Sequence, residues 1–190
     1  MLDRAPKDRQ PAQRKKESAR PCLLAATATV GAVVGLNLLF ELLGLTDSSA
    51  AYRAVRANQY SAAFGVGLLC YGVLPPVAEE LLFRGILFNR MKRFLDLKLA
   101  VVASALCFGA YHGNMVQGVY GFLMGCLMAY AYVYFGSFRA PLGIHIGANL
   151  LAYSLSFLAG IPAGFVSWPM AVLFLGIGAG SLRLLSRSPR

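Results

Sequence analysis

Charged residues are scarce in this chain of 190 residues: they make up 14% of it, whereas 57% of the residues are hydrophobic. A soluble domain of ordinary composition carries about 25% charged residues. Residues 99–138 and residues 140–182 contain no Asp, Glu, Lys or Arg at all. Because a helix that crosses a bilayer needs roughly 20 apolar residues, each stretch can supply two spans joined by a turn. The composition excludes an ordinary soluble domain and indicates an integral membrane protein.

Several motifs of chemical interest are also missing. The four cysteines are scattered without a Cys-x-x-Cys pair, which argues against a disulfide framework and a cysteine zinc site. There is no His-Glu-x-x-His for a zincin-type helix. The Gly-x-Ser-Gly of rhomboid-like serine sites and the Gly-x-Gly-Asp of aspartyl intramembrane sites are absent as well. Cys107 is five residues from His112, about 140° around a helix, so the two do not form a good Cys–His pair.

The net charge is +10, but the positions of the basic residues argue against a nucleic-acid-binding surface. Seven of the 18 Lys and Arg residues precede Cys22, four lie in 90–98, and three close the chain. They flank hydrophobic segments and are not interleaved with aromatic residues, so we expect no nucleic-acid partner. The positive-inside rule and anionic lipid head groups explain them, and we expect anionic lipid at the basic N-terminal tail.

Hydropathy predicts an all-α membrane protein with a disordered basic cytosolic tail at 1–21 and a polytopic membrane domain at 22–185. Six spans place both termini on the same side, with 15 Lys and Arg residues there and two on the other side. This bias assigns the basic side to the cytoplasm, and we expect the protein in the plasma membrane. The predicted spans are 22–45, 60–94 with a bend at Pro75-Pro76, 99–113, 115–135, 141–160 and 165–182; 46–59 is predicted as a loop.

Small residues recur at a spacing of four in these apolar segments, which favours close approach of helix backbones. Ordinary helix packing is a sufficient interpretation of each such pattern. The four Gly-x-x-x-Gly patterns are Gly31/Gly35, Gly109/Gly113, Gly121/Gly125 and Gly143/Gly147.

Ionisable groups inside the predicted spans are few, and each costs roughly 2.5–3.5 kcal/mol to insert, so they indicate function. Glu80 and Arg84 are four residues apart and share a helix face, so we expect them to neutralise each other. Glu79 points about 100° away from Glu80 and is free to face a polar cavity. A purely structural ion-pair cluster is the alternative interpretation.

Both histidines of the chain, His112 and His145, fall inside predicted spans, and Asn149 lies one helical turn after His145. A single intramembrane histidine is more often a packed, hydrogen-bonded residue than a catalyst. A carboxylate, two imidazoles and a carboxamide together, however, form a hydrolytic set. The carboxylate can activate water, an imidazole can position it or bind a metal, and the remaining groups can donate to an oxyanion.

Three motifs in this order resemble those of the CAAX protease and bacteriocin-processing (CPBP or Abi) family of intramembrane proteases. They are Glu79-Glu80-x-x-x-Arg84 followed by Gly85, Phe108-x-x-x-His112 and His145-x-x-x-Asn149, and the resemblance covers about 60–160. It implies an intramembrane endopeptidase that cleaves membrane-embedded or lipid-associated peptides or protein terminal segments. The resemblance also implies that Glu79 activates water and that His112 assists it. By the same resemblance, His145 and Asn149 stabilise the oxyanion. Glu80 and Arg84 then support the site.

The family is often described as metalloproteases, and the residues leave the metal open. Glu79, His112 and His145 could ligate zinc. We prefer a metal-free, glutamate-activated water, because Asn149 suits an oxyanion hole better than a zinc shell. Two further classes remain: a non-catalytic membrane immunity or scaffold protein that binds a peptide in the same cavity, and a small transporter with Glu and His as a proton relay. The absence of an internal repeat disfavours the transporter.

One catalytic site requires that three distant segments meet. We therefore expect Glu79 and His112 to share one water, their side chains roughly 3–6 Å apart, and the two histidines to lie within about 12 Å of each other. Along a helix Glu79 is about 16 Å from Arg90, and Asn149 is about 12 Å from Pro141. These depths predict a cavity that opens towards the basic, cytoplasmic side.

Overall fold

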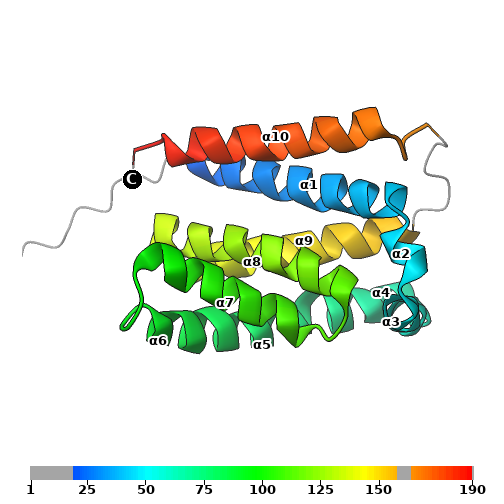
Figure 1. Cartoon of the computed structure of the whole chain (residues 1–190), viewed down its shortest axis with the longest axis horizontal. Helices are drawn as coiled ribbons and strands as arrows, with labels where there is room; N and C mark the ends of the chain where they lie inside the picture. The colour runs from blue at the N-terminus through cyan, green and yellow to red at the C-terminus, as the bar shows by residue number, and fades with distance from the viewer. Residues whose placement is uncertain (1–18, 158–163, 190) are drawn as a thin grey trace, which may run out of the picture.

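The chain folds as a bundle of helices (Figure 1), seen in a computed structural model that describes residues 19–157 and 164–189. All the elements within these ranges are helical. They are α1 (Ala19–Leu42), α2 (Leu45–Ser48), α3 (Ala50–Tyr60), α4 (Phe64–Gly67), the π-helix η1 (Leu68–Val73), α5 (Leu74–Glu80), the π-helix η2 (Leu81–Phe88), α6 (Asn89–Met91), α7 (Leu97–Tyr111), α8 (Met115–Phe135), α9 (Arg139–Phe157) and α10 (Trp168–Ser186).

Four of these helical stretches are long and apolar enough to cross a membrane: α1, the run from Phe64 to Met91, α8 and α10. Helix α7 is apolar but has 15 residues, and α9 is not among the four. The all-α membrane class predicted from composition is therefore confirmed, with four candidate spans in the described part of the chain. The remaining two of the six predicted spans correspond to α7 and α9.

The run from Phe64 to Met91 stays helical through Pro75-Pro76 by changing its hydrogen-bond pattern. Leu74 donates its N–H to the carbonyl of Leu69, five residues back, which is the π-helical spacing. The two prolines then occupy the first turn of α5, where a missing N–H is tolerated. Glu79 and Glu80 end α5, immediately before the second π segment, and such segments often occur at functional sites.

Helices α1 and α10 lie side by side along one face of the bundle, and α7 packs on α8 (Figure 1). Close approach of α1 and α10 depends on Gly31, where a Cβ atom would lie 2.5 Å from the backbone nitrogen of Gly178. A core of Phe83, Phe108, Met128 and Ile144 joins η2, α7, α8 and α9. This core surrounds the polar residues of the predicted site.

Two predicted boundaries differ from the structure. Most of the expected disordered tail falls on 1–18, outside the described residues, but residues 19–21 form the first turn of α1. The expected loop at 46–59 instead forms α2 and α3. Helix α3 begins after Ser49, whose side chain accepts a hydrogen bond from the Tyr52 N–H as an N-cap. The alanines that follow favour a helix, and this local signal outweighs the polar composition.

Candidate active site

Glu80 and Arg84 form a fully buried ion pair inside the bundle. The Arg84 Nη1 donates to Glu80 Oε1 at 2.7 Å, and the two side chains are 1% and 0% exposed. The other guanidinium nitrogen, Nη2, donates to the carbonyl of Gly125 on α8 at 3.0 Å. The four-residue spacing predicts the pair, but the bond to α8 depends on tertiary packing. Arg84 thereby ties the Glu79–Glu80 turn to a neighbouring helix.

His145 joins this pair from α9 and places its ring between the two glutamates. Its Nδ1 lies 2.8 Å from Glu80 Oε1, and its Nε2 lies 3.5 Å from Glu79 Oε2. Since an ionised carboxylate can only accept hydrogen bonds, Nδ1 carries the proton towards Glu80. The result is a buried chain of contacts from Arg84 through Glu80 and His145 to Glu79. Such an outer carboxylate fixes the orientation of an imidazole ring.

Glu79 differs from Glu80 in its surroundings. Its side chain is 14% exposed and borders the cavity described below, whereas Glu80 is fully enclosed. Glu80 Oε2 has no hydrogen-bond partner in the described structure, because Oε1 receives both Arg84 and His145. The more accessible carboxylate is therefore the one that can meet a substrate or a water.

His112 is the C-cap residue directly after α7 and lines the same cavity. Its Nδ1 lies 2.9 Å from the carbonyl of Phe108, one turn earlier. The Phe108 ring lies edge-on to both imidazoles, with centroids 4.9 Å from His112 and 5.5 Å from His145. The two imidazole centroids are thus no farther apart than the sum of these distances, which is within the predicted limit of about 12 Å. Gly121 on α8 leaves room for the His112 ring, because a Cβ there would lie 3.3 Å from it.

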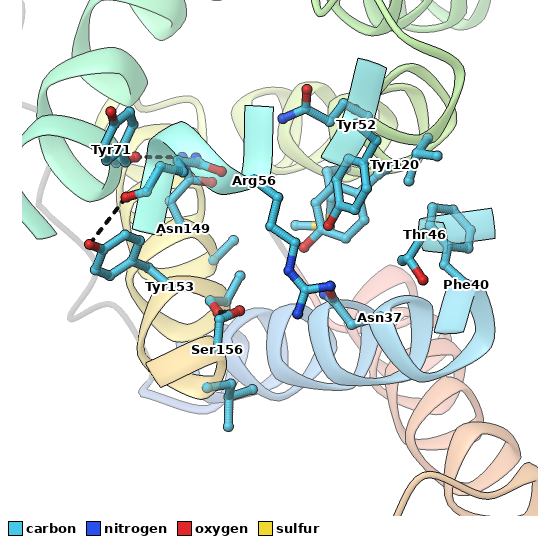
Figure 2. A pocket seen from close by; sticks show the side chains of 18 of the residues that line it. Asn37, Phe40, Thr46, Tyr52, Arg56, Tyr71, Tyr120, Asn149, Tyr153 and Ser156 are labelled. Atoms are coloured by element: carbon cyan, nitrogen blue, oxygen red, sulfur yellow. Dashed lines mark hydrogen bonds between the residues drawn. The ribbon is translucent and has the colours of Figure 1, made fainter. Parts of the chain in front are cut away.

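Asn149 has a partner that the motif alone did not indicate. Its amide nitrogen donates to the carbonyl of Tyr71 at 3.1 Å (Figure 2). In a helix this carbonyl would accept from residue 75 or, with π spacing, from residue 76, and both are proline. Asn149 therefore satisfies a carbonyl that the two prolines leave without a backbone donor. An amide carries two N–H groups, so one remains for another acceptor.

A cavity of about 800 Å³ connects these groups, and Glu79, His112, His145 and Asn149 all line it. Other lining residues lie in the last turns of α1 and α9, in α3, and before α10. They include Glu41, Arg56, Gln59, Tyr60, Ser156 and Phe165. Exposed Arg56 and Ser156 lie where the cavity reaches the surface.

The opening of the cavity at Arg56 and Ser156, called the mouth below, lies at the α2–α3 end of the bundle. The α6–α7 and α8–α9 connections lie at the other end (Figure 1). Arg90, Lys98 and Arg139 are close to those connections. The cavity thus widens away from the basic end, although depth along the helices predicted that it opens towards that end. Depth along the helices depends on Glu79 and Asn149 alone and does not include α3, a segment for which hydropathy predicts a loop.

The metal hypothesis finds no ready set of ligands. Within the described ranges, no three His, Cys, Asp or Glu side chains come together with the geometry of a metal site. Glu80 holds His145 Nδ1 and the Phe108 carbonyl holds His112 Nδ1, contacts of the kind that also orient metal-binding imidazoles. Glu79, His112 and His145 are therefore not assembled as a ready three-ligand shell, and no chemical step is derived through a metal.

Several residues at this site were not predicted from the sequence. The carbonyls of Tyr71 and Gly125 receive Asn149 and Arg84, and backbone acceptors leave no mark in a motif. Tyr153 lines the cavity and packs against Gly67, where a Cβ would lie 1.6 Å from the tyrosine hydroxyl. Arg56 and Tyr120 also line the cavity. Pro75-Pro76 was the one available signal, because consecutive prolines imply carbonyls that need other donors.

Helices of membrane-spanning length around a buried carboxylate–histidine cluster define a polytopic membrane protein with a polar intramembrane site. Residues 61–151, just under half of the chain, match the family described as type II CAAX prenyl endopeptidase, Rce1-like. This match agrees with the resemblance inferred from the three motifs. No curated protein and no solved structure matches the chain.

Proposed function

We propose that this protein is an intramembrane endopeptidase that cleaves a membrane-embedded or lipid-associated peptide, or a terminal segment of a protein. The observation that carries the proposal is the cavity-lining Glu79 carboxylate beside His145, within a segment of the Rce1-like family. Glu79 acts as a general base: it takes a proton from a water, and the resulting hydroxide attacks the scissile carbonyl. His112 helps to position that water.

His145 and Asn149 stabilise the oxyanion that forms on the attacked carbonyl oxygen. Because His145 Nδ1 is directed to Glu80, donation from Nε2 requires the doubly protonated imidazolium. Asn149 contributes its second N–H, the first being bound to Tyr71. Two donors facing one oxyanion are the usual means of such stabilisation.

The reaction as proposed uses these side chains alone. Protonated Glu79 then returns its proton to the leaving amine, which completes hydrolysis. Glu80 and Arg84 are positioning residues. They hold His145 and anchor the α5–η2 turn to α8 through Gly125.

We further propose six spans in the plasma membrane, with both termini and the 90–98 loop in the cytoplasm and anionic lipid at the basic tail. The distribution of Lys and Arg supports this orientation. With the cavity mouth at the α2–α3 end, the same orientation makes the mouth face away from the cytoplasm. Two expectations, a cytoplasmic basic end and a cytoplasmic mouth, are therefore incompatible, and the charge bias supports the first.

Comparative peptidomics tests the proposed activity. Cells with the wild-type protein are compared with cells that carry Glu79→Gln at equal protein level. We expect peptides that appear only with the wild type, ending at a common cleavage site. Identical peptide profiles would reject the protease and favour the non-catalytic protein that binds a peptide in this cavity.

A further inference from the structure

A second polar cluster lines the same cavity. It consists of Arg56 on α3, Tyr120 on α8, Asn37 on α1 and Tyr52 on α3. Figure 2 shows Arg56 reaching from α3 across the cavity towards Asn37, with Tyr52 and Tyr120 on one side and Asn149 and Tyr153 on the other. The proposed hydrolysis does not use any of these four residues.

The Arg56 guanidinium has no ion pair and no hydrogen bond with any residue that the structure describes. Arg53 on the same helix provides a contrast, since its Nη1 donates to the carbonyl of Asp47. The carboxylate of Glu41 also lines the cavity, but its Oε2 is engaged by the Thr46 hydroxyl at 2.8 Å. Arg56, exposed at the surface end of the cavity, therefore has guanidinium N–H donors without an acceptor among the described residues.

Tyr120 provides an independent observation. Its hydroxyl is buried from bulk solvent and has no hydrogen-bond partner among the described residues. The Asn37 amide is close enough to interact with it, but the two do not form a hydrogen bond of good geometry, and Asn37 Nδ2 donates to Val33 O instead. A buried hydroxyl without a partner is destabilising, so a ligand that accepts its hydrogen bond is favoured.

From these donors we infer that Arg56 and Tyr120 form a subsite for a carboxylate of the bound peptide. The inference rests on the proposed function, because it assigns a substrate group to the same cavity. A guanidinium pairs with a carboxylate through two parallel hydrogen bonds, and a phenol hydroxyl adds a third donor. The carboxylate can belong to the peptide's C-terminus or to an acidic side chain. Arg56 and Tyr120 are thus specificity-determining residues, distinct from the hydrolytic groups.

Binding of defined peptides to full-length Glu79→Gln protein tests the subsite, because slow turnover leaves the peptide intact. The probes are fluorescein-labelled mixtures of apolar nonapeptides, prepared and measured as three separate versions. The first has a free C-terminal acid, the second a C-terminal amide, and the third a C-terminal amide with one internal Glu. The protein is held in phosphatidylcholine nanodiscs, and binding is followed by fluorescence anisotropy. We expect a carboxylate-bearing version to bind about tenfold more tightly than the plain amide. The version that shows the preference identifies the source of the carboxylate.

Arg56→Gln should abolish the preference, Arg56→Lys should restore part of it, and Tyr120→Phe should reduce it severalfold. Arg53→Gln is the matched control and should keep the full preference. If the Glu79→Gln protein shows no preference for carboxylate-bearing peptides, the subsite is rejected. This holds whether all peptide versions bind equally or none binds. Native mass spectrometry adds a second arm. Loss of a bound phospholipid in Arg56→Gln, without any acid preference, assigns the guanidinium to a lipid phosphate and likewise overturns the inference.

The peptidome comparison separates this inference from the proposed function. Cleavage without an acid preference rejects the subsite and keeps the protease. An acid preference with an unchanged peptidome keeps the subsite and rejects the protease.

Discussion

Adjacent glutamates at the end of α5 differ in burial and in partners. Glu79 borders the cavity, whereas Glu80 is enclosed and accepts hydrogen bonds from Arg84 and His145. Glu79→Gln should abolish cleavage and leave protein level and melting temperature nearly unchanged, because the amide keeps the shape and removes the base. Activity measured beside thermal unfolding in detergent checks this. Strong destabilisation would mean that Glu79 is a structural residue.

Glu80→Ala should instead destabilise the protein by about 3–5 kcal/mol, because it leaves the Arg84 charge buried without its partner. The melting temperature and the expressed amount are the measurements. A double variant, Glu80→Leu with Arg84→Met, is the control, since it removes both charges and should recover much of the stability. A Glu80→Ala protein as stable as the wild type would contradict the buried pair.

Asn149 has two separable roles that a mutant cycle can distinguish. Asn149→Ala should cost about 1–3 kcal/mol, because the Tyr71 carbonyl loses its donor. In a Pro75→Ala background, residue 75 supplies an N–H to that carbonyl, so the same change should cost less. Thermal unfolding of the four proteins measures this coupling. Cleavage should remain low in the double variant, because the oxyanion donor is still absent; full recovery of cleavage would limit Asn149 to the structural role.

Residue spacing predicted some of these contacts and could not predict others. The four-residue interval between Glu80 and Arg84 indicates a shared helix face, and the structure has the ion pair. The approach of His145 to both glutamates joins residues 65 or more apart in sequence, so no local pattern encodes it. The motif order supported a common site only through the family resemblance. The roles of the individual residues stay predictions until the variants above are measured.

Among the elements, glycine patterns that look alike in sequence have different surroundings. A Cβ at Gly31 would lie 2.5 Å from backbone of α10, and a Cβ at Gly121 would touch the His112 ring. Gly113 instead has a positive φ of 71° at the turn after α7. Gly143 and Gly147 face open space, with no atom within 4 Å of a Cβ. Four-residue spacing therefore predicts a small-residue stripe, but not whether another helix covers it.

Gly31→Ala should destabilise the protein by about 1–3 kcal/mol, because backbone atoms of α10 must move to admit the methyl group. Gly147→Ala is the matched control: the same change at a helical position with open space around it should be neutral or stabilise by up to about 1 kcal/mol. Melting temperatures in one detergent compare the two. Equal losses would contradict the close packing of α1 against α10.

Over the whole molecule, hydropathy located the six long helical segments to within a few residues, because long apolar runs are required to cross a bilayer. It missed α3, whose amphipathic sequence is neither apolar enough for a span nor flexible enough for a loop. That helix carries Arg56 and Tyr60, which line the cavity mouth. The structure accordingly differs from the sequence-based prediction in the direction of the mouth, which lies at the end opposite the basic one.

Membrane topology is the last prediction, and it fixes the compartment that the cavity faces. Reporters placed after Arg190 and within 90–98 should lie in the cytoplasm, because 15 of the 18 Lys and Arg residues belong to that side. A reporter within 46–59 should lie on the opposite side, together with α3 and the mouth. Paired phosphatase and fluorescent-protein fusions measure each position, and equal protein levels control for expression.

Agreement of the 90–98 and Arg190 reporters tests the number of spans independently of the orientation, because an even number of crossings must separate them. If both lie in the cytoplasm, substrate peptides enter the cavity from the far side of the membrane or laterally from the bilayer. If both lie outside, the mouth at α3 faces the cytoplasm and the charge bias does not set the orientation. Reporters on opposite sides would show that α7, with 15 residues, or α9 does not cross the membrane.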